Sequence, residues 1–341
     1  MAADSRVAVP ESGRIRTAIT RLLEIDHPIL LAPMGGIAGG ALAGAVSAAG
    51  GLGLIGAGYA DPSFGYGSAD WIGSEFDKAG GQSIGIGFIT WALEQRPGAL
   101  DAALERQPRA VMLSFGDIAP YAAKIRDAGA ILICQVQSLK DARDAVTHGA
   151  QLIVAQGTEA GGHGADRSTL PLVPAVVDTV APIPVAAAGG IADGRGLAAA
   201  LMLGAGGVLI GTRFWATKEA LGHPNQKSLI ERTGGGQTLR TSVFDTARGL
   251  AWPRPYTGRA IRNAFTEAWH GRDDELRSEG PTVRERLFAA GRDGDTETAV
   301  TYAGEGLDLI DDQPAAGELV GRIITEAIHA LTETAGMLAT D

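Results

Sequence analysis

The sequence predicts an α/β protein built on a (β/α)8 barrel, with a smaller and mostly helical C-terminal cap. Eight short apolar segments alternate with segments of helical character, and turn residues separate them. The chain has 341 residues, of which 45% are hydrophobic, enough for a barrel of roughly 250 residues with additions. Its 49 glycines lack a collagen-like period and therefore indicate many tight loops between strands and helices.

Short apolar runs define the eight predicted strands. In chain order these are Ile29–Ala32, Leu52–Ile55, Ser83–Phe88, Ala110–Ser114, Ala130–Val136, Gln151–Ala155, Ile183–Ala187 and Gly206–Ile210. Helices are predicted at Ile15–Leu23, Ala41–Ala49, Pro97–Gln107, Tyr121–Asp127 and Leu139–His148. The alternative is a doubly wound open sheet, which more often carries the motif G-x-G-x-x-G after its first strand. This chain has Pro33-Met34-Gly35-Gly36 at that point instead.

The segment between the second and third predicted strands is rich in aromatic residues. It contains Tyr59, Phe64, Tyr66 and Trp71, and we predict that it forms a long loop. Long loops on barrels are usually functional. The segment is therefore a candidate part of the functional site.

The alternation of strands and helices ends after the eighth strand. Residues 221–314 combine a triple glycine, mixed charges and helix signals at Ala260–His270 and Val283–Ala290, and we interpret them as a helical cap subdomain. Between Leu319 and Leu331, apolar residues recur with helical spacing, which predicts a last helix packed on the barrel. The predicted barrel domain therefore comprises residues 1–220 and 315–341. Residues 1–13 are small and polar, and we interpret them as a frayed leader segment.

Charge and cysteine content exclude several classes of protein. The formal net charge of -10 argues against a nucleic-acid binder, which needs clustered Lys and Arg. The single cysteine, Cys134, excludes an intramolecular disulfide framework and a cysteine-based zinc site. No run approaches the ~18 apolar residues of a membrane helix, and a signal-peptide core is lacking. These features predict a cytoplasmic protein with a small-molecule partner, and they leave its oligomeric state open.

The stretch Gln156–His163 combines glycines with one titratable ring, directly after the predicted strand at Gln151–Ala155. Gly161 and Gly162 let the main chain lie against a planar ligand, because no Cβ holds the ligand away. His163 is then the nearby group that can transfer a proton near neutral pH. The alternative is a glycine-bent surface loop with a solvated histidine.

Two further glycine loops follow the seventh and eighth predicted strands. Gly189-Gly190 follows Ile183–Ala187, and Gly211-Thr212 follows Gly206–Ile210. In a barrel these loops are neighbours, and their free main-chain N–H groups form a site for a phosphate dianion. The alternative is a pair of ordinary barrel loops without a ligand.

These motifs resemble the nitronate monooxygenase family, which consists of FMN enzymes on a (β/α)8 barrel. The matching segments are Ala32–Gly35, Gly50–Gly53, Ala155–His163, Ala187–Ala192 and Gly211-Thr212. The resemblance implies that His163 is the catalytic base. It also implies a set of cofactor-binding residues, in which Pro33 and Met34 lie against the flavin ring, Gln156 and Gly161 contact the cofactor, and Gly189, Gly190, Gly211 and Thr212 hold its phosphate. Many members have an asparagine at the end of the third strand, where this chain ends with Phe88, so one expected polar contact has no counterpart.

Several other residues are weighed as parts of the site. Gln135 ends the fifth predicted strand and is expected to point into the site, its alternative being an amide satisfied at the strand end. Cys134 is expected to face the packing layers, which also disfavours a barrel of the IMP-dehydrogenase type with a reactive loop cysteine. Glu159 is expected to be a solvated carboxylate, its alternative being a residue that orients the loop or the histidine. The remaining histidines lack metal-ligand spacing, and no metal site is predicted.

The sequence therefore predicts an FMN-dependent oxidoreductase that oxidises nitroalkanes or alkyl nitronates with O2. One alternative is a reductase on the same scaffold that uses NAD(P)H, of the enoyl-acyl-carrier-protein reductase or NADH:quinone reductase type. Another alternative, from a different class, is a flavin-binding module without catalytic activity.

Overall fold

The computed structural model of the protein describes residues 13–337, so residues 1–12 of the predicted leader lie outside it. At its centre, eight parallel strands are arranged in the order β1-β9-β8-β6-β5-β4-β3-β2. A parallel bridge between Leu30 and Leu52 joins the two ends of this order and closes the ring. The predicted (β/α)8 barrel is thereby confirmed. Its strands are β1 (Ile29–Leu31), β2 (Leu54–Gly58), β3 (Gly85–Ile89), β4 (Ala110–Ser114), β5 (Ile131–Val136), β6 (Leu152–Gln156), β8 (Val185–Ala188) and β9 (Gly207–Ile210).

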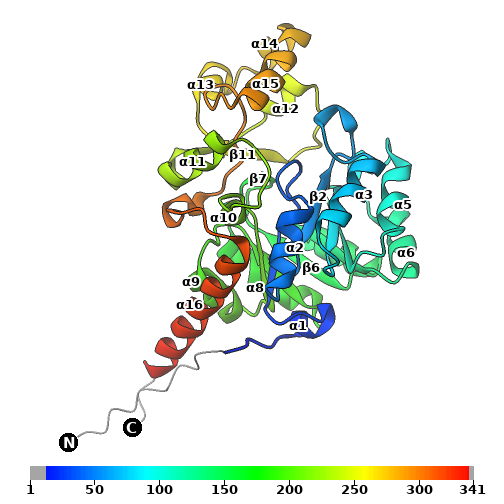
Figure 1. Cartoon of the computed structure of the whole chain (residues 1–341), viewed down its shortest axis with the longest axis vertical. Helices are drawn as coiled ribbons and strands as arrows, with labels where there is room; N and C mark the ends of the chain where they lie inside the picture. Colours follow the sequence, from blue (N-terminus) through cyan, green and yellow to red (C-terminus); the bar gives the residue numbers. More distant parts are fainter. Residues whose placement is uncertain (1–12, 338–341) are drawn as a thin grey trace, which may run out of the picture.

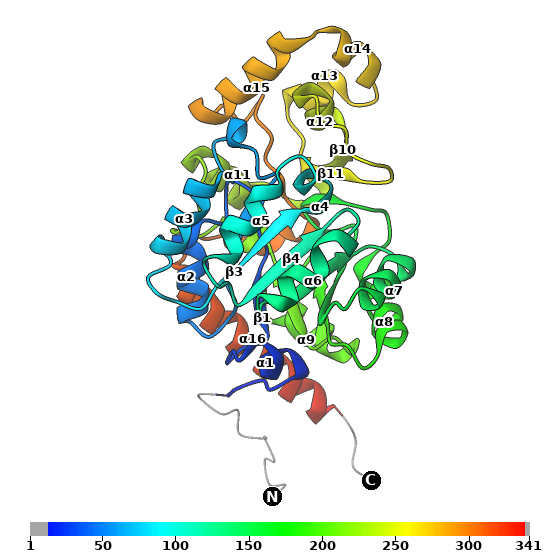
Figure 2. The ribbon, with the colours of Figure 1, turned by 90° about the vertical axis from the view of Figure 1, so that its right-hand side faces the viewer.

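Helices surround this ring (Figures 1 and 2). The predicted helices correspond to α1 (Ala18–Leu23), α2 (Gly40–Ala48), α5 (Pro97–Leu104), α6 (Ala119–Asp127), α7 (Leu139–Thr147) and α16 (Ala316–Gly336). Five further helices were not predicted from the sequence: α3 (Ala69–Lys78), α4 (Thr90–Leu93), α8 (Thr169–Val180), α9 (Gly194–Met202) and α10 (Thr212–Trp215). α8 contains an internal proline, Pro174, together with β-branched residues, and both weaken a helix signal.

The aromatic segment after β2 is not one long loop as predicted. Its second part forms α3, which the side chain of Ser68 caps by accepting a hydrogen bond from the Trp71 N–H. The helix is held by its buried residues Ile72 and Glu75. The Glu75 carboxylate accepts a hydrogen bond from the Gly40 N–H at the start of α2, 2.7 Å away. Tertiary contacts of this kind stabilise a helix whose local sequence is rich in turn residues.

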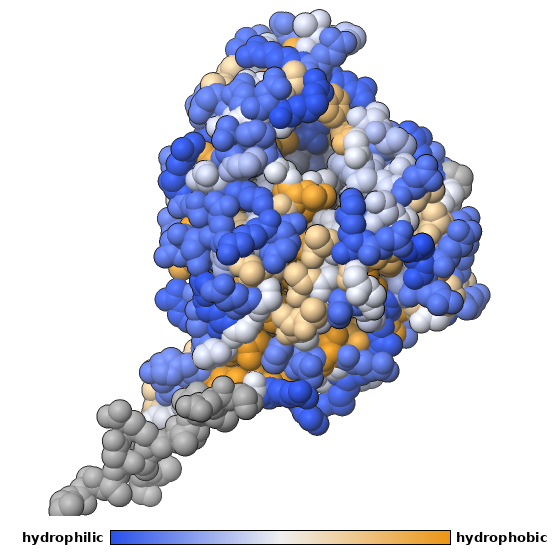
Figure 3. Space-filling model, in the orientation of Figure 1, coloured by the Kyte–Doolittle hydropathy of each residue, from blue (hydrophilic) through white to orange (hydrophobic). Residues whose placement is uncertain are grey.

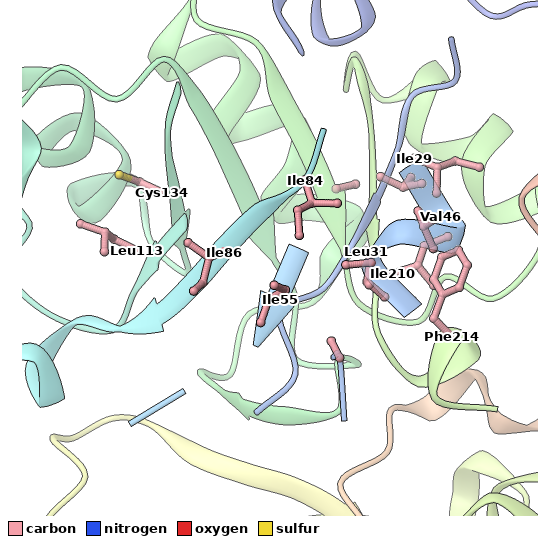
Figure 4. Packing of buried hydrophobic residues seen from close by; sticks show 14 of the residues in the cluster. Ile29, Leu31, Val46, Ile55, Ile84, Ile86, Leu113, Cys134, Ile210 and Phe214 are labelled. Carbon is pink, nitrogen blue, oxygen red and sulfur yellow. The ribbon is translucent and has the colours of Figure 1, made fainter. Parts of the chain in front are cut away.

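Alternating side chains of the barrel strands pack inward and outward. In β1, Leu30 belongs to the cluster inside the ring, whereas Ile29 and Leu31 belong to the layer between strands and helices. Figure 4 shows this outer layer, in which strand residues lie beside helix residues such as Val46 and Phe214. Cys134 packs in the same layer, as expected, and burial raises the pKa of its thiol to about 12.

The cap lies over one end of the barrel, at the top of Figures 1 and 2. It contains a three-stranded sheet in the order β10-β11-β7, in which both pairings are antiparallel. The strand β7 comes from the loop after β6, so barrel and cap share one sheet. The elements are β7 (Gly162–Gly164), α11 (Pro224–Arg232), β10 (Thr238–Thr241), α12 (Val243–Arg248), β11 (Thr257–Ile261), α13 (Ala264–Trp269), α14 (Asp273–Ser278) and α15 (Pro281–Asp293). The division between the two domains at residues 220 and 315 stays a prediction.

The predicted helix at Ala260–His270 is wrong at its start. Ala260 and Ile261 are the last residues of β11, and Asn263 caps the shorter helix α13. β11 pairs with β10 on one side and β7 on the other. These pairings join segments far apart in the chain, and they override the local helical pattern.

On the face shown in Figure 3, the cap is mostly hydrophilic, and hydrophobic side chains gather over the middle and base of the barrel. Across residues 13–337, no helix has both the length and the apolar character that crossing a membrane requires.

Candidate active site

A cavity of about 510 Å³ lies between the carboxyl ends of the barrel strands and the cap. All the site residues expected from the sequence line it: Pro33, Met34, Gln135, Gln156, Gly161, Gly162, His163, Gly189, Gly190, Gly211 and Thr212. They come from six segments of the chain that meet here because parallel strands of a barrel all end at the same face. Phe88 also lines the cavity and is buried, so the wall is apolar at the point where an asparagine was expected.

His163 lies in β7 and is held by a carboxylate from the cap. Its Nε2 is 2.8 Å from Oδ2 of Asp245, and both side chains are nearly buried, with 8% and 5% exposure. Because a carboxylate accepts only, Nε2 carries the hydrogen and Nδ1 is the acceptor nitrogen of the neutral ring. Nδ1 has no hydrogen-bond partner within the described residues, so it is available to a ligand.

Two opposing effects act on the pKa of His163. Burial lowers this pKa below its ordinary value of 6.5, whereas the Asp245 carboxylate raises it, and burial prevails. The ring is therefore neutral at pH 7 and can accept a proton. Asp245 is then placed to stabilise the imidazolium that forms.

Trp252 covers one face of the His163 ring. The two rings stack with centroids 3.6 Å apart and an interplanar angle of 5°. The indole Nε1 of Trp252 donates a hydrogen bond to the Tyr59 hydroxyl at 2.9 Å, which ties the segment between α12 and β11 to the barrel. Phe115 packs edge-on against Trp252 at 5.1 Å between centroids. These contacts restrict the orientation of the imidazole.

Aromatic side chains form much of the remaining wall. Tyr59, Phe64 and Tyr66, from the segment predicted to be functional, line the cavity, whereas Trp71 packs behind Tyr66 in α3. Tyr302, from the chain segment that follows α15, also lines the cavity, and burial raises the pKa of its hydroxyl. The wall can therefore take apolar, planar groups and supplies neutral hydroxyls to them.

Three glutamine amides form a cluster below the His163 segment. The Oε1 of Gln156 accepts hydrogen bonds from Gln135 at 3.2 Å and from Gln137 at 2.7 Å. Its Nε2 donates to the main-chain oxygen of His163 at 3.0 Å. The cluster therefore fixes the main chain that carries the imidazole and leaves the Gln135 side chain on the cavity wall.

Glu159 is not a solvated carboxylate as expected. It accepts hydrogen bonds from the N–H and the hydroxyl of Thr169 at the start of α8, the latter at 2.7 Å. Its main-chain oxygen accepts from the Glu305 N–H at 2.9 Å. A Cβ on Gly161 would lie 2.7 Å from the Ala303 carbonyl carbon, so this position needs glycine. Glu159 thus anchors the glycine loop on both sides.

The two loops expected to bind phosphate lie on the same wall. Within the described part of the chain, the main-chain N–H groups of Gly190 and Thr212 donate to no protein group. A Cβ on Gly211 would make only ordinary contacts, at 3.5 Å from Ala32 and Met34, so this position has room for one. Free N–H groups around a space without side chains fit an anionic group such as a phosphate.

Sequence reasoning missed four residues of this site: Asp245, Arg248, Trp252 and Tyr302. Asp245 and Arg248 are three residues apart on α12 and therefore share one helix face. That spacing is a possible sequence signal, but nothing in it points to His163, 82 residues away. Trp252 and Tyr302 lie in segments between regular elements and carry no pattern that assigns them to the cavity.

Sequence comparisons match the chain to one family model and to enzymes over most of their length. The family model for nitronate monooxygenase matches residues 16–77 and 92–326. A nitronate monooxygenase of Neurospora crassa is 34% identical over 88% of this chain and 89% of that protein. The (3aS,4S,5R,7aS)-5-hydroxy-7a-methyl-1-oxo-octahydro-1H-indene-4-carboxyl-CoA dehydrogenase of Mycobacterium tuberculosis is 31% identical over 94% of this chain and 99% of that protein.

Solved structures show the same likeness in three dimensions. FabK from Thermotoga maritima superposes with a TM-score of 0.81 and 31% identity, covering 95% of this chain and 100% of that one. Nitroalkane oxidase from Streptomyces ansochromogenes superposes with a TM-score of 0.76 and 27% identity, covering 93% and 100%.

Proposed function

The chain belongs to the nitronate monooxygenase family and is an oxidoreductase, and on that premise we propose that it oxidises small nitroalkanes or alkyl nitronates with FMN and O2. The observation that carries this proposal is the position of the His163–Asp245 pair. A neutral, carboxylate-held imidazole lines the same cavity as the two glycine loops that we expect to bind phosphate. The site can therefore hold a phosphorylated cofactor and remove a proton beside it.

The residues of the cavity fit FMN. Gly189, Gly190, Gly211 and Thr212 would hold the phosphate, because they leave N–H groups and space for it. The flavin ring would lie against the apolar and glycine surfaces of Pro33, Met34, Gly161 and Gly162, with the Gln135 and Gln156 amides in reach. When bound, the flavin supplies the electron-accepting chemistry, which none of these side chains provides.

In this proposal, His163 acts as the general base on a neutral nitroalkane. Nδ1 takes the proton from the α-carbon, and the hydrogen bond from Nε2 to Asp245 stabilises the charged ring. Trp252 and the Gln156 cluster keep the imidazole in place during the transfer. A substrate that arrives as the nitronate has already lost this proton, so His163 then serves only to position it.

The experiment that tests this proposal is anaerobic mixing of the purified protein with a nitronate and, separately, with NADH. We expect the flavin absorbance to decay with the nitronate and to persist with NADH. Rapid bleaching by NADH alone would contradict the proposal and support a reductase.

A second candidate function, an NAD(P)H-dependent reductase on the same scaffold, is supported by two of the likenesses. One relative is named as a dehydrogenase of a carboxyl-CoA compound, a substrate much larger than a nitroalkane, and FabK superposes over its whole length. The non-catalytic module has no comparable support, because the family model and these relatives are named as enzymes.

A further inference from the structure

Arg248, a partly buried arginine on the cavity wall, forms no ion pair with a carboxylate among residues 13–337. Arg248 ends α12. Within the described residues, its guanidinium makes one hydrogen bond, to the Tyr302 hydroxyl at 3.3 Å, and lies 5.6 Å from the centre of that ring. Arg213 on the same wall is instead paired with Asp312. Arg248 is therefore a cation that retains unused donors beside the cavity.

The acid nearest in sequence to Arg248 is already engaged. Asp245 lies one helical turn earlier, and its carboxylate holds His163. Tyr302 joins the two groups, since its hydroxyl accepts from Arg248 and lies 3.5 Å from Oδ1 of Asp245. Burial lowers the pKa of Arg248, but Tyr302, Tyr59 and the Asp245 carboxylate raise it, and the net effect is a raised pKa, so the guanidinium stays charged. Among the described residues its N–H groups donate to no carboxylate, and a planar oxyanion would satisfy them.

We propose that Arg248 forms an anion subsite that binds the two oxygens of the substrate's nitro group. This inference rests on the proposed function and assigns the residue that binds the negative charge formed when the α-proton leaves. As Nδ1 of His163 takes the α-proton, the electrons of the C–H bond form the second bond of C=N. One N–O π pair moves onto oxygen, and the resulting negative charge is shared by two oxygens that face the guanidinium. In this arrangement His163 accepts the proton and Arg248 binds the negative charge.

The subsite also defines a specificity. It favours planar two-oxygen anions over neutral groups of the same shape, because the guanidinium fork matches both the charge and the spacing of two oxygens. The aromatic wall around it, which includes Tyr59 and Trp252, takes the alkyl part. Isobutyrate has the shape of 2-nitropropane and the two-oxygen negative charge of its nitronate but does not react, and isobutyramide is its neutral counterpart.

Calorimetric titration of the purified protein with these two compounds tests the subsite without turnover. We expect isobutyrate to bind more tightly than isobutyramide, and Arg248→Met to weaken isobutyrate about 10-fold or more while isobutyramide binding is unchanged. Arg272→Met is the matched control. Arg272 also lies over an aromatic ring of the cap, at 5.2 Å from the centre of Trp269, but it does not line the cavity.

A second variant guards against a folding defect. Arg248→Lys keeps the charge and loses the fork, so we expect isobutyrate affinity between those of the parent protein and Arg248→Met, with the same flavin content in all three. Equal isobutyrate affinity in parent and Arg248→Met, or no preference for isobutyrate in the parent, would overturn the subsite. If the preference depends on Arg248 but no nitronate is oxidised, the subsite stands and the proposed function fails.

Discussion

The Oδ2 atom of Asp245 lies 2.8 Å from Nε2 of His163, although the two residues belong to different parts of the fold. His163 extends from the barrel on β7, and Asp245 belongs to α12 of the cap. The cap is therefore part of the candidate active site and not only a cover for it. This pairing also assigns Nδ1 as the ring nitrogen that can accept a proton.

Replacing His163 tests whether it removes the α-proton or only positions the substrate. His163→Ala should lower the turnover of a neutral nitroalkane by roughly 10²- to 10⁴-fold, the usual contribution of a positioned acid–base group. Turnover of the preformed nitronate should fall much less, because that substrate has already lost its α-proton. Steady-state rates on both substrates check this, with flavin content measured in parallel. Equal losses on both would show that His163 only positions the substrate.

The rate of proton removal should depend on pH through His163. Its pKa lies below 6.5, so kcat/KM for a neutral nitroalkane should be constant above pH 7 and fall as acid protonates the ring. The Asp245 carboxylate raises this pKa, so Asp245→Asn should move the falling limb to lower pH. The same change should lower the plateau, because a weaker base removes the proton more slowly.

A matched control for this pH experiment is Asp273→Asn. Asp273 accepts hydrogen bonds from Ser242 and Thr246 in the same cap and does not contact His163. We expect its pH profile to match that of the parent protein. A limb that stays in place in Asp245→Asn would mean that another group controls the profile.

Gly211 offers a clean test of the phosphate site. Its Cβ would meet only Ala32 and Met34 at 3.5 Å, so Gly211→Val should fold and lose FMN because the side chain enters the phosphate position. Gly190 is less suitable, since its φ of +71° strains any other residue. Absorbance of the purified variant measures occupancy, and chromatography of the flavin released from the parent should identify FMN and not FAD.

The control for the glycine test is Gly73→Val, in α3, where a Cβ meets nothing within 4 Å. This variant should keep its flavin. Full occupancy in Gly211→Val would place the phosphate elsewhere.

Glu159 should contribute to stability through the start of α8. Glu159→Ala removes the acceptor for the Thr169 N–H and hydroxyl, and we expect the free energy of unfolding to fall by about 1 kcal/mol. Urea denaturation measures the change. Glu285→Ala, an exposed position on α15, should stay within about 0.5 kcal/mol of the parent. If the urea midpoint of Glu159→Ala equalled that of the parent protein, the Glu159 carboxylate would contribute nothing to stability.

The barrel and one wall of the site could be predicted from local sequence. Buried strands contain continuous apolar runs such as Leu152–Ala155, and glycines beyond their carboxyl ends mark the loops that meet at one face. From this pattern alone, His163, Gly190 and Gly211 could be predicted to lie at one face of the barrel, and all three line the cavity. The family resemblance likewise marked Phe88, the last residue of the predicted third strand, as an apolar replacement for asparagine, although β3 runs on to Ile89.

Only the tertiary structure decided which groups face these residues from the cap. Asp245, Arg248 and Trp252 reach His163 through the pairing of β11 with β7, which joins residues nearly 100 positions apart and leaves no periodic pattern in the sequence. Because of the same pairing, Ala260 lies in a strand and not in the predicted helix. The hydrogen bond from Thr169 likewise holds the Glu159 carboxylate, which was expected to be solvated. Local sequence determines the period and the ends of strands, whereas partners brought together by long-range pairing determine the charges that surround the reacting ring.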